Sequence, residues 1–103
     1  MNRQILFHPE VLEELREHYF WYEQKSSGLG ERFLLVLELA YEIIQESPTV
    51  WPKTRNIFHK YQVNKFPFNV IYFVHEDRIT VYAVAHFSRK PFYWEHRPTE
   101  IRG

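Results

Sequence analysis

Two stretches in the first half of the chain carry apolar residues at the three- and four-residue spacing of an amphipathic helix. A short apolar run at residues 3–7 comes first and predicts a strand. The first helical stretch then opens at Pro9, and its expected apolar face consists of Val11, Leu12, Leu15, Tyr19 and Tyr22. The second opens at Leu29 and ends at Ser47-Pro48, and its stripe consists of Phe33, Val36, Leu37, Ala40, Ile43 and Ile44. Gly28 suits a left-handed helix cap, so the short link predicts an antiparallel helical hairpin.

The second half of the chain changes to the two-residue period of strands. A loop is expected at residues 48–55, and Trp51 is expected to fill the seam between the helices and the sheet. Residues 56–63 alternate, residues 66–74 are apolar enough for a strand buried on both faces, and residues 78–86 alternate again. In the last strand, one face is expected to carry Ile79, Val81, Ala83 and Ala85, and the other Thr80, Tyr82, Val84 and His86.

The resulting order is β-α-α-β-β-β, which predicts an α+β fold. The helical hairpin should pack on a small, mainly antiparallel sheet that is followed by a short C-terminal segment. With 103 residues, the whole chain, 1–103, is expected to form one domain. The chain has no cysteine and no run of apolar residues long enough to span a membrane, which favours a cytoplasmic protein.

The formal net charge is zero, yet the charges are divided unequally along the chain. Residues 1–52 carry four Lys/Arg and nine Asp/Glu, whereas residues 53–103 carry nine Lys/Arg and four Asp/Glu. A basic second half indicates a polyanionic or acidic partner. The alternative is that the two halves neutralise each other within the fold.

Several kinds of site are not supported by the residue pattern. The three glycines do not form a phosphate-binding loop, and the six histidines lack the spacing of metal ligands. No serine stands in a strand-turn-helix elbow of the kind that hydrolases use. We therefore expect neither a metal ion nor another cofactor.

Acid-base groups, cations and aromatic rings are most concentrated after the last strand. Cleavage of RNA by its own 2′-hydroxyl needs a base, an acid and cations that stabilise the phosphate, and His86, Arg89 and Tyr93 could divide these roles with Lys60 and Lys65. The structural alternatives are equally simple. His86 would cap a neighbouring backbone carbonyl at a strand end, and Tyr93 and Trp94 would form a lid that packs on the sheet.

Several motifs in the chain resemble those of the RelE/ParE superfamily, the toxins of bacterial type II toxin-antitoxin pairs. Near the start, the resemblance rests on Phe7-His8-Pro9, Glu13, Tyr22, Gly28-Leu29-Gly30 and Phe33. In the second half, it rests on Phe66-Pro67-Phe68, Tyr72, Ala83-Val84-Ala85-His86, Arg89-Lys90-Pro91-Phe92-Tyr93-Trp94 and Arg97. Phe68 stands where the family usually has tyrosine.

The resemblance implies a toxin that a cognate antitoxin holds inactive by covering its basic face. Some members of the superfamily cut messenger RNA on the ribosome without a metal ion, and others poison DNA gyrase. The zero net charge and the closing motif favour the ParE-like side, with gyrase as the expected target. Two alternatives stay open: a ribosome-dependent mRNA endonuclease, and an inactive interaction module.

The resemblance also implies which residues form the site. In a nuclease, the catalytic residues would be His86, Arg89 and Tyr93. The residues expected to bind the target or nucleic acid are Lys53, Arg55, Lys60, Lys65, Lys90, Trp94 and Arg97.

Overall fold

The expected α+β fold and order of elements are confirmed in a computed structural model, which describes residues 3–98. The elements are β1 (Gln4–Phe7), α1 (Pro9–Lys25), α2 (Leu29–Glu46), β2 (Lys53–Thr54), β3 (Phe58–Gln62), β4 (Phe68–His75) and β5 (Arg78–His86). They form one five-stranded sheet in the order β1-β5-β4-β3-β2. Strand β1 runs parallel to β5, and the other neighbours are antiparallel. Within residues 3–98, neither helix is long and apolar enough to cross a membrane.

The helical hairpin follows from local signals in the sequence. His8 caps α1, because its Nδ1 accepts a hydrogen bond from the backbone N–H of Glu10, and Pro9 occupies the first turn. Gly28 adopts a φ of 88° at the start of α2, as its left-handed role predicts. Gly30 lets the helices meet, since a Cβ atom there would lie 2.7 Å from the backbone oxygen of Tyr19.

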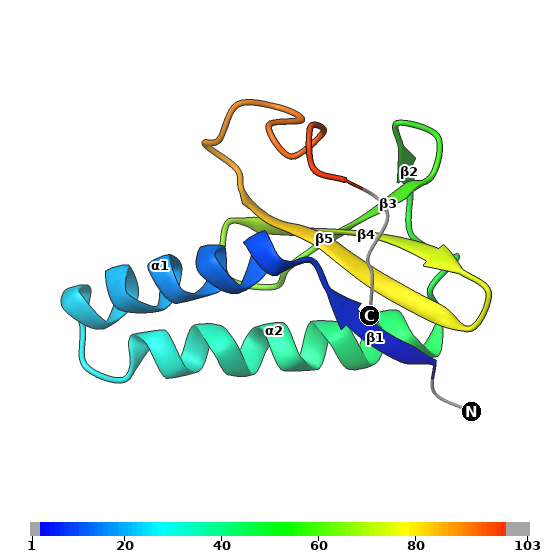
Figure 1. Cartoon of the computed structure of the whole chain (residues 1–103). Coiled ribbons are helices and arrows are strands. Elements are labelled where there is room, and N and C mark those ends of the chain that lie inside the picture. Colours follow the sequence, from blue (N-terminus) through cyan, green and yellow to red (C-terminus); the bar gives the residue numbers. More distant parts are fainter. Residues whose placement is uncertain (1–2, 99–103) are drawn as a thin grey trace.

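The sheet is covered on both faces (Figure 1). The two helices lie against one face, and a segment without regular secondary structure, residues 87–97, crosses the opposite face; we call this segment the strap. The larger core lies on the helix side and includes Val11, Phe33, Leu37, Tyr72 and Val81. A smaller core lies under the strap and consists of Phe58, Ile71, Tyr82, Ala83 and Trp94.

The alternation expected for the last strand is wrong beyond Tyr82. Tyr72 pairs with Val81 and Ile71 pairs with Ala83, so Tyr82 is an extra residue that forms a β-bulge. The bulge reverses the alternation. As a result, Val84 packs in the helix-side core, while Tyr82 and Ala83 both pack under the strap.

Other local expectations need correction. The expected loop at residues 48–55 contains the short strand β2, and β3 begins at Phe58 rather than at residue 56. Leu12 is 58% exposed and Ile43 is 40% exposed, so both lie outside the buried faces predicted for the helices. Helical spacing located each face to within one turn but did not fix its edges.

Trp51 packs against the helix-side core, as expected, and the loop around it is tied to the sheet. Its ring meets Tyr61 edge to face, with centroids 4.7 Å apart. The Trp51 carbonyl accepts a hydrogen bond from His59 Nδ1 at 2.8 Å, and the Tyr72 hydroxyl donates to the Pro48 carbonyl at 2.6 Å.

Candidate functional site at the strap

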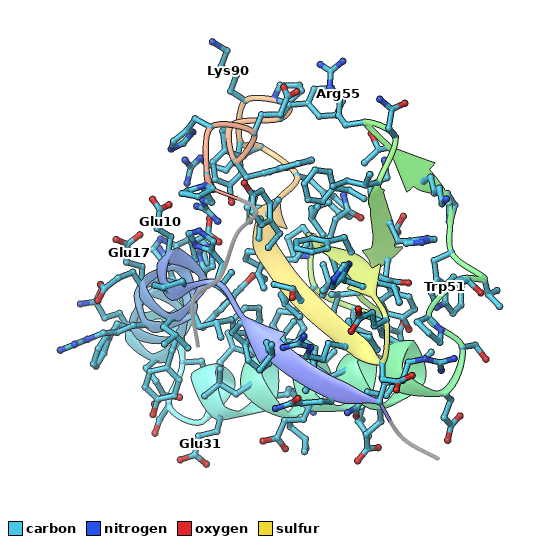
Figure 2. All side chains as sticks on the ribbon, turned by 45° about the vertical axis from the view of Figure 1, so that its right-hand side comes forward. Glu10, Glu17, Glu31, Trp51, Arg55 and Lys90 are labelled. Atoms are coloured by element: carbon cyan, nitrogen blue, oxygen red, sulfur yellow. The ribbon has the colours of Figure 1, made fainter. Side chains whose placement is uncertain are left out.

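A pocket of about 200 Å³ lies between the strap and the sheet face under it. Strand β3 contributes Lys60, the end of β5 contributes His86, and the strap contributes Arg89, Lys90 and Tyr93. The fold thus collects around one pocket several of the cations and acid-base groups that were singled out from the sequence. Figure 2 shows Arg55 and Lys90 at the strap end of the molecule, while Glu17 and Glu31 project from the helices.

The strap is fixed to α1 by a buried carboxylate. Glu14 receives two hydrogen bonds from the Arg97 guanidinium, at 3.1 and 2.9 Å, and a third from the Tyr93 hydroxyl. The backbone N–H of Val84 donates to the same carboxylate at 3.2 Å. Arg97 also donates to the Tyr82 carbonyl at 2.9 Å. Glu14 therefore joins helix, sheet and strap at one point.

This network determines the protonation of Tyr93. Burial raises the pKa of the Tyr93 hydroxyl, and its hydrogen bond to Glu14 raises that pKa further. A tyrosine acts as a general base only when its hydroxyl can ionise near the working pH. In this conformation Tyr93 is a hydrogen-bond donor to Glu14 and is unsuited to the role of base.

Arg97 is held in its charged form by the same carboxylate. Burial disfavours the charge, but the hydrogen bonds and charge of Glu14 outweigh burial and raise the pKa of Arg97. Only 7% of the Arg97 residue is exposed. The cation is thus neutralised inside the protein.

His86 is bound on one side by its own turn. The backbone N–H of Ser88 lies 3.0 Å from His86 Nδ1, and the Ser88 hydroxyl lies 2.7 Å from the same atom. Since Nδ1 accepts from the backbone, the proton of the neutral imidazole lies on Nε2. This is the structural alternative foreseen for a strand-end histidine, with a backbone N–H in place of a carbonyl.

Arg89, the third catalytic candidate, stacks on the Tyr93 ring at 3.9 Å. The remaining residues of the expected binding set divide into three groups. Arg55 stacks on the Phe92 ring at 3.8 Å and pairs with Glu95 at 3.2 Å. Lys53 and Lys65 are exposed but do not line the pocket.

Trp94 and Arg97 form the third group, and their expected place on a binding surface needs correction. Trp94 is 3% exposed and its ring packs on Phe58 and Tyr82 at centroid distances of 4.8 and 5.8 Å. It is a core residue, as the lid alternative predicted. Arg97 is buried against Glu14, so in this conformation a partner would contact neither side chain.

Sequence reasoning missed Glu14, which is not among the candidate site residues. A signal was present. Glu14 follows Val11 by three residues and precedes His18 and Tyr22 at four-residue steps, which places it on the core-facing stripe. A carboxylate on such a stripe requires a partner. Which partner it finds, 83 positions away in the sequence, is not encoded locally.

Among residues 3–98, no group of three or more His, Asp or Glu side chains is arranged to hold a metal ion. The described part of the site therefore offers hydrogen bonds, positive charge and aromatic surface.

The fold has clear counterparts among solved structures. A chain of the chromosomal ParDE toxin-antitoxin system of P. aeruginosa superimposes with a TM-score of 0.73 and 10% sequence identity, covering 82% of this chain and 95% of that one. The E. coli toxin RelE, as a mutant in the free state, superimposes with a TM-score of 0.60 and 17% identity, covering 85% and 86%. No protein-family model and no curated protein matches the sequence. The chain shares the fold of these two structures.

Proposed function

We propose that this chain is the toxin of a bacterial type II toxin-antitoxin pair. It is ParE-like, arrests growth in the cytoplasm by binding a protein target such as DNA gyrase, and is neutralised by a cognate antitoxin. The observation that carries the proposal is the match to the ParDE chain, which covers 95% of that chain at a TM-score of 0.73. The engagement of Tyr93 with Glu14 also favours binding over RNA cleavage.

The binding surface proposed for the target is the exposed, cationic rim of the strap pocket. Lys60, Arg89 and Lys90 are all exposed there, and Arg55 lies next to them on Phe92. We expect acidic residues of the antitoxin to cover the same rim, or its extended segment to add to β1 or β2 at the edges of the sheet.

A ribosome-dependent mRNA endonuclease is the second candidate. The observation in its favour is that His86 lines the same pocket as Lys60 and Arg89, so an acid-base group lies among cations that can bind phosphate. In this candidate Tyr93 would have to leave Glu14 before it could exchange a proton.

Inducible expression without a partner tests the proposal. Gyrase poisoning predicts growth arrest with an induced DNA-damage response and intact messages, and coexpression of the antitoxin should restore growth. Arrest with messages cleaved in translating ribosomes would replace the first candidate by the second. Normal growth with soluble, folded protein would contradict both and indicate an inactive interaction module.

Charge variants test the proposed surface. Lys60→Ala and Lys90→Ala should reduce toxicity about 10-fold each while circular dichroism stays unchanged, because each removes an exposed cation at the rim. Lys25→Ala removes an exposed cation from the end of α1 and is the matched control. Equal toxicity of all three variants would contradict the proposed surface. Loss of toxicity in both Arg89→Ala and Tyr93→Phe, with messages no longer cleaved, would favour the nuclease.

A further inference from the structure

The strap is held to the rest of the protein mainly by side chains. The backbone N–H of Phe87 donates to the Pro67 carbonyl at 2.9 Å, at the point where the strap leaves β5. Beyond it, the backbone hydrogen bonds found in the described part of the strap are short-range. They run from Arg89 to His86, Tyr93 to Lys90, Glu95 to Phe92 and Arg97 to Trp94. A segment that shares no hydrogen-bonded ladder with its sheet can open without breaking the sheet.

Two polar anchors hold the strap. At one, Glu14 of α1 binds both Tyr93 and Arg97. At the other, Arg55 stacks on Phe92 and pairs with Glu95. The second anchor lies at the surface, with about half of each charged side chain exposed, so water competes with it. The Glu14 anchor is buried and is the stronger constraint.

Three features keep the closed state from being deeply stable. Phe92 adopts a φ of 60°, which is strained for an aromatic residue. Among the described residues, the buried Tyr82 hydroxyl has no hydrogen-bond partner, and the buried Arg97 Nε makes no hydrogen bond but lies 3.5 Å from the Glu10 carboxylate. Burial of the Glu14–Arg97 pair also removes two charges from water, which offsets much of their attraction. Opening of the strap would release the backbone strain at Phe92 and return the buried polar and charged groups to water.

We infer that the strap is a cover that opens as a unit, and that Glu14 is the latch that keeps it closed. In the closed state the strap forms the outer wall of the pocket and shields Phe58, Ile71 and Tyr82. In the open state the wall is lost and this apolar surface is uncovered. Glu14 is thus a positioning residue, which couples α1 to the pocket through Tyr93 and Arg97. The inference does not rest on the proposed function, because it concerns the closed conformation itself.

Hydrogen exchange of the purified protein, resolved by residue, tests the latch. The amides of Tyr93, Glu95 and Arg97 report on the strap, because each donates its hydrogen bond to a carbonyl of the strap itself. In the wild type they should exchange at least 10-fold faster than the amides of β4 and β5. In Glu14→Gln, which keeps the shape but removes the charge, they should exchange at least a further 10-fold faster.

Glu13→Gln is the matched control, since it removes an exposed carboxylate one residue earlier on the same helix. It should leave strap exchange unchanged. Arg55→Gln, which weakens the surface anchor, should accelerate strap exchange by a smaller factor than Glu14→Gln does. Trypsin gives an independent readout, with faster cleavage after Arg89 in Glu14→Gln than in the control.

Two outcomes would overturn the inference. If strap and sheet amides exchange at the same rate in the wild type, the strap opens only when the whole protein unfolds. If Glu14→Gln leaves the exchange of the strap amides unchanged, as expected for the Glu13→Gln control, Glu14 does not hold the strap and is no latch. Neither measurement involves growth or toxicity, so a failed latch and a failed toxin assignment are distinguishable.

Discussion

Replacement of Trp94 by alanine tests most directly whether the strap is part of the core. Trp94 is 3% exposed, and its ring packs edge to face on Phe58, Tyr82 and Phe92. Truncation removes the indole and leaves a cavity whose walls, built by strands on one side, can collapse only partly. Loss of a buried Trp side chain typically costs about 3–5 kcal/mol of unfolding free energy.

This magnitude is large for a chain of 103 residues. Domains of this size are stable by about 5–15 kcal/mol, so Trp94→Ala should remove a substantial share of the total. With a urea slope of about 1.5 kcal/mol per M, the lower end of the expected loss shifts the unfolding midpoint by about 2 M. Far-UV circular dichroism is the suitable probe, because the tryptophan fluorescence of the variant and the wild type differs.

The matched control is Trp21→Ala on α1. Trp21 is 55% exposed and its ring lies under Lys25 at 4.9 Å, an exposed cation–π contact worth about 0.5–1 kcal/mol. The urea unfolding midpoint of Trp21→Ala should therefore move by less than about 0.7 M. Equal shifts for the two variants, or a Trp94→Ala midpoint within that range, would refute the burial of Trp94 and return it to the candidate binding surface.

Three further predictions follow from single contacts. Gly30→Ala should lower the unfolding free energy by about 1–3 kcal/mol, although alanine has the better helix propensity, because the new Cβ would lie 2.7 Å from a backbone oxygen of α1. A thermal melt measures the loss. Arg97→Met should lower the unfolding free energy, measured in urea, by about 3–5 kcal/mol, because it removes the cation that pairs with the buried Glu14 carboxylate. Arg55→Gln, which removes the cation of the exposed pair with Glu95, should lower it by less than about 1 kcal/mol. Burial lowers the pKa of His18 from its usual 6.5, so as pH falls the unfolded chain binds a proton before the folded protein does. The unfolding free energy should therefore be fully present above about pH 6.5 and decline below it. Between pH 7.5 and 5.5, His18→Gln should show a smaller decline in unfolding free energy than the wild type.

The helical hairpin could be derived from sequence because its determinants are local. A proline and a capping residue before Glu10, a glycine that accepts a positive φ, and apolar residues at helical spacing all act within a few positions of one another. The same holds for the existence of the three longer strands after the helices, and hence for the fold class. The edges of each buried face were less certain, as the exposure of Leu12 and Ile43 shows, because they depend on how far the sheet extends.

The bulge at Tyr82 and the course of the strap could not be derived in this way. Alternation along one strand gives the side of each residue only while the strand stays in register with its neighbour, and register is a property of two strands. The sequence placed cations, His86 and aromatic residues after the last strand, and the fold brings several of them to one pocket. The sequence did not reveal that the side chains of Trp94 and Arg97 are buried in the interior.

The sequence by itself thus determined the fold class, the helical hairpin and the basic, aromatic character of the chain's end. Only the tertiary structure decided which of those residues face a partner and which serve the interior. The physical reason lies at Glu14. A carboxylate on a core-facing stripe has to be neutralised, and the cation that neutralises it lies 83 positions later in the chain, within reach only after the strap has crossed the sheet.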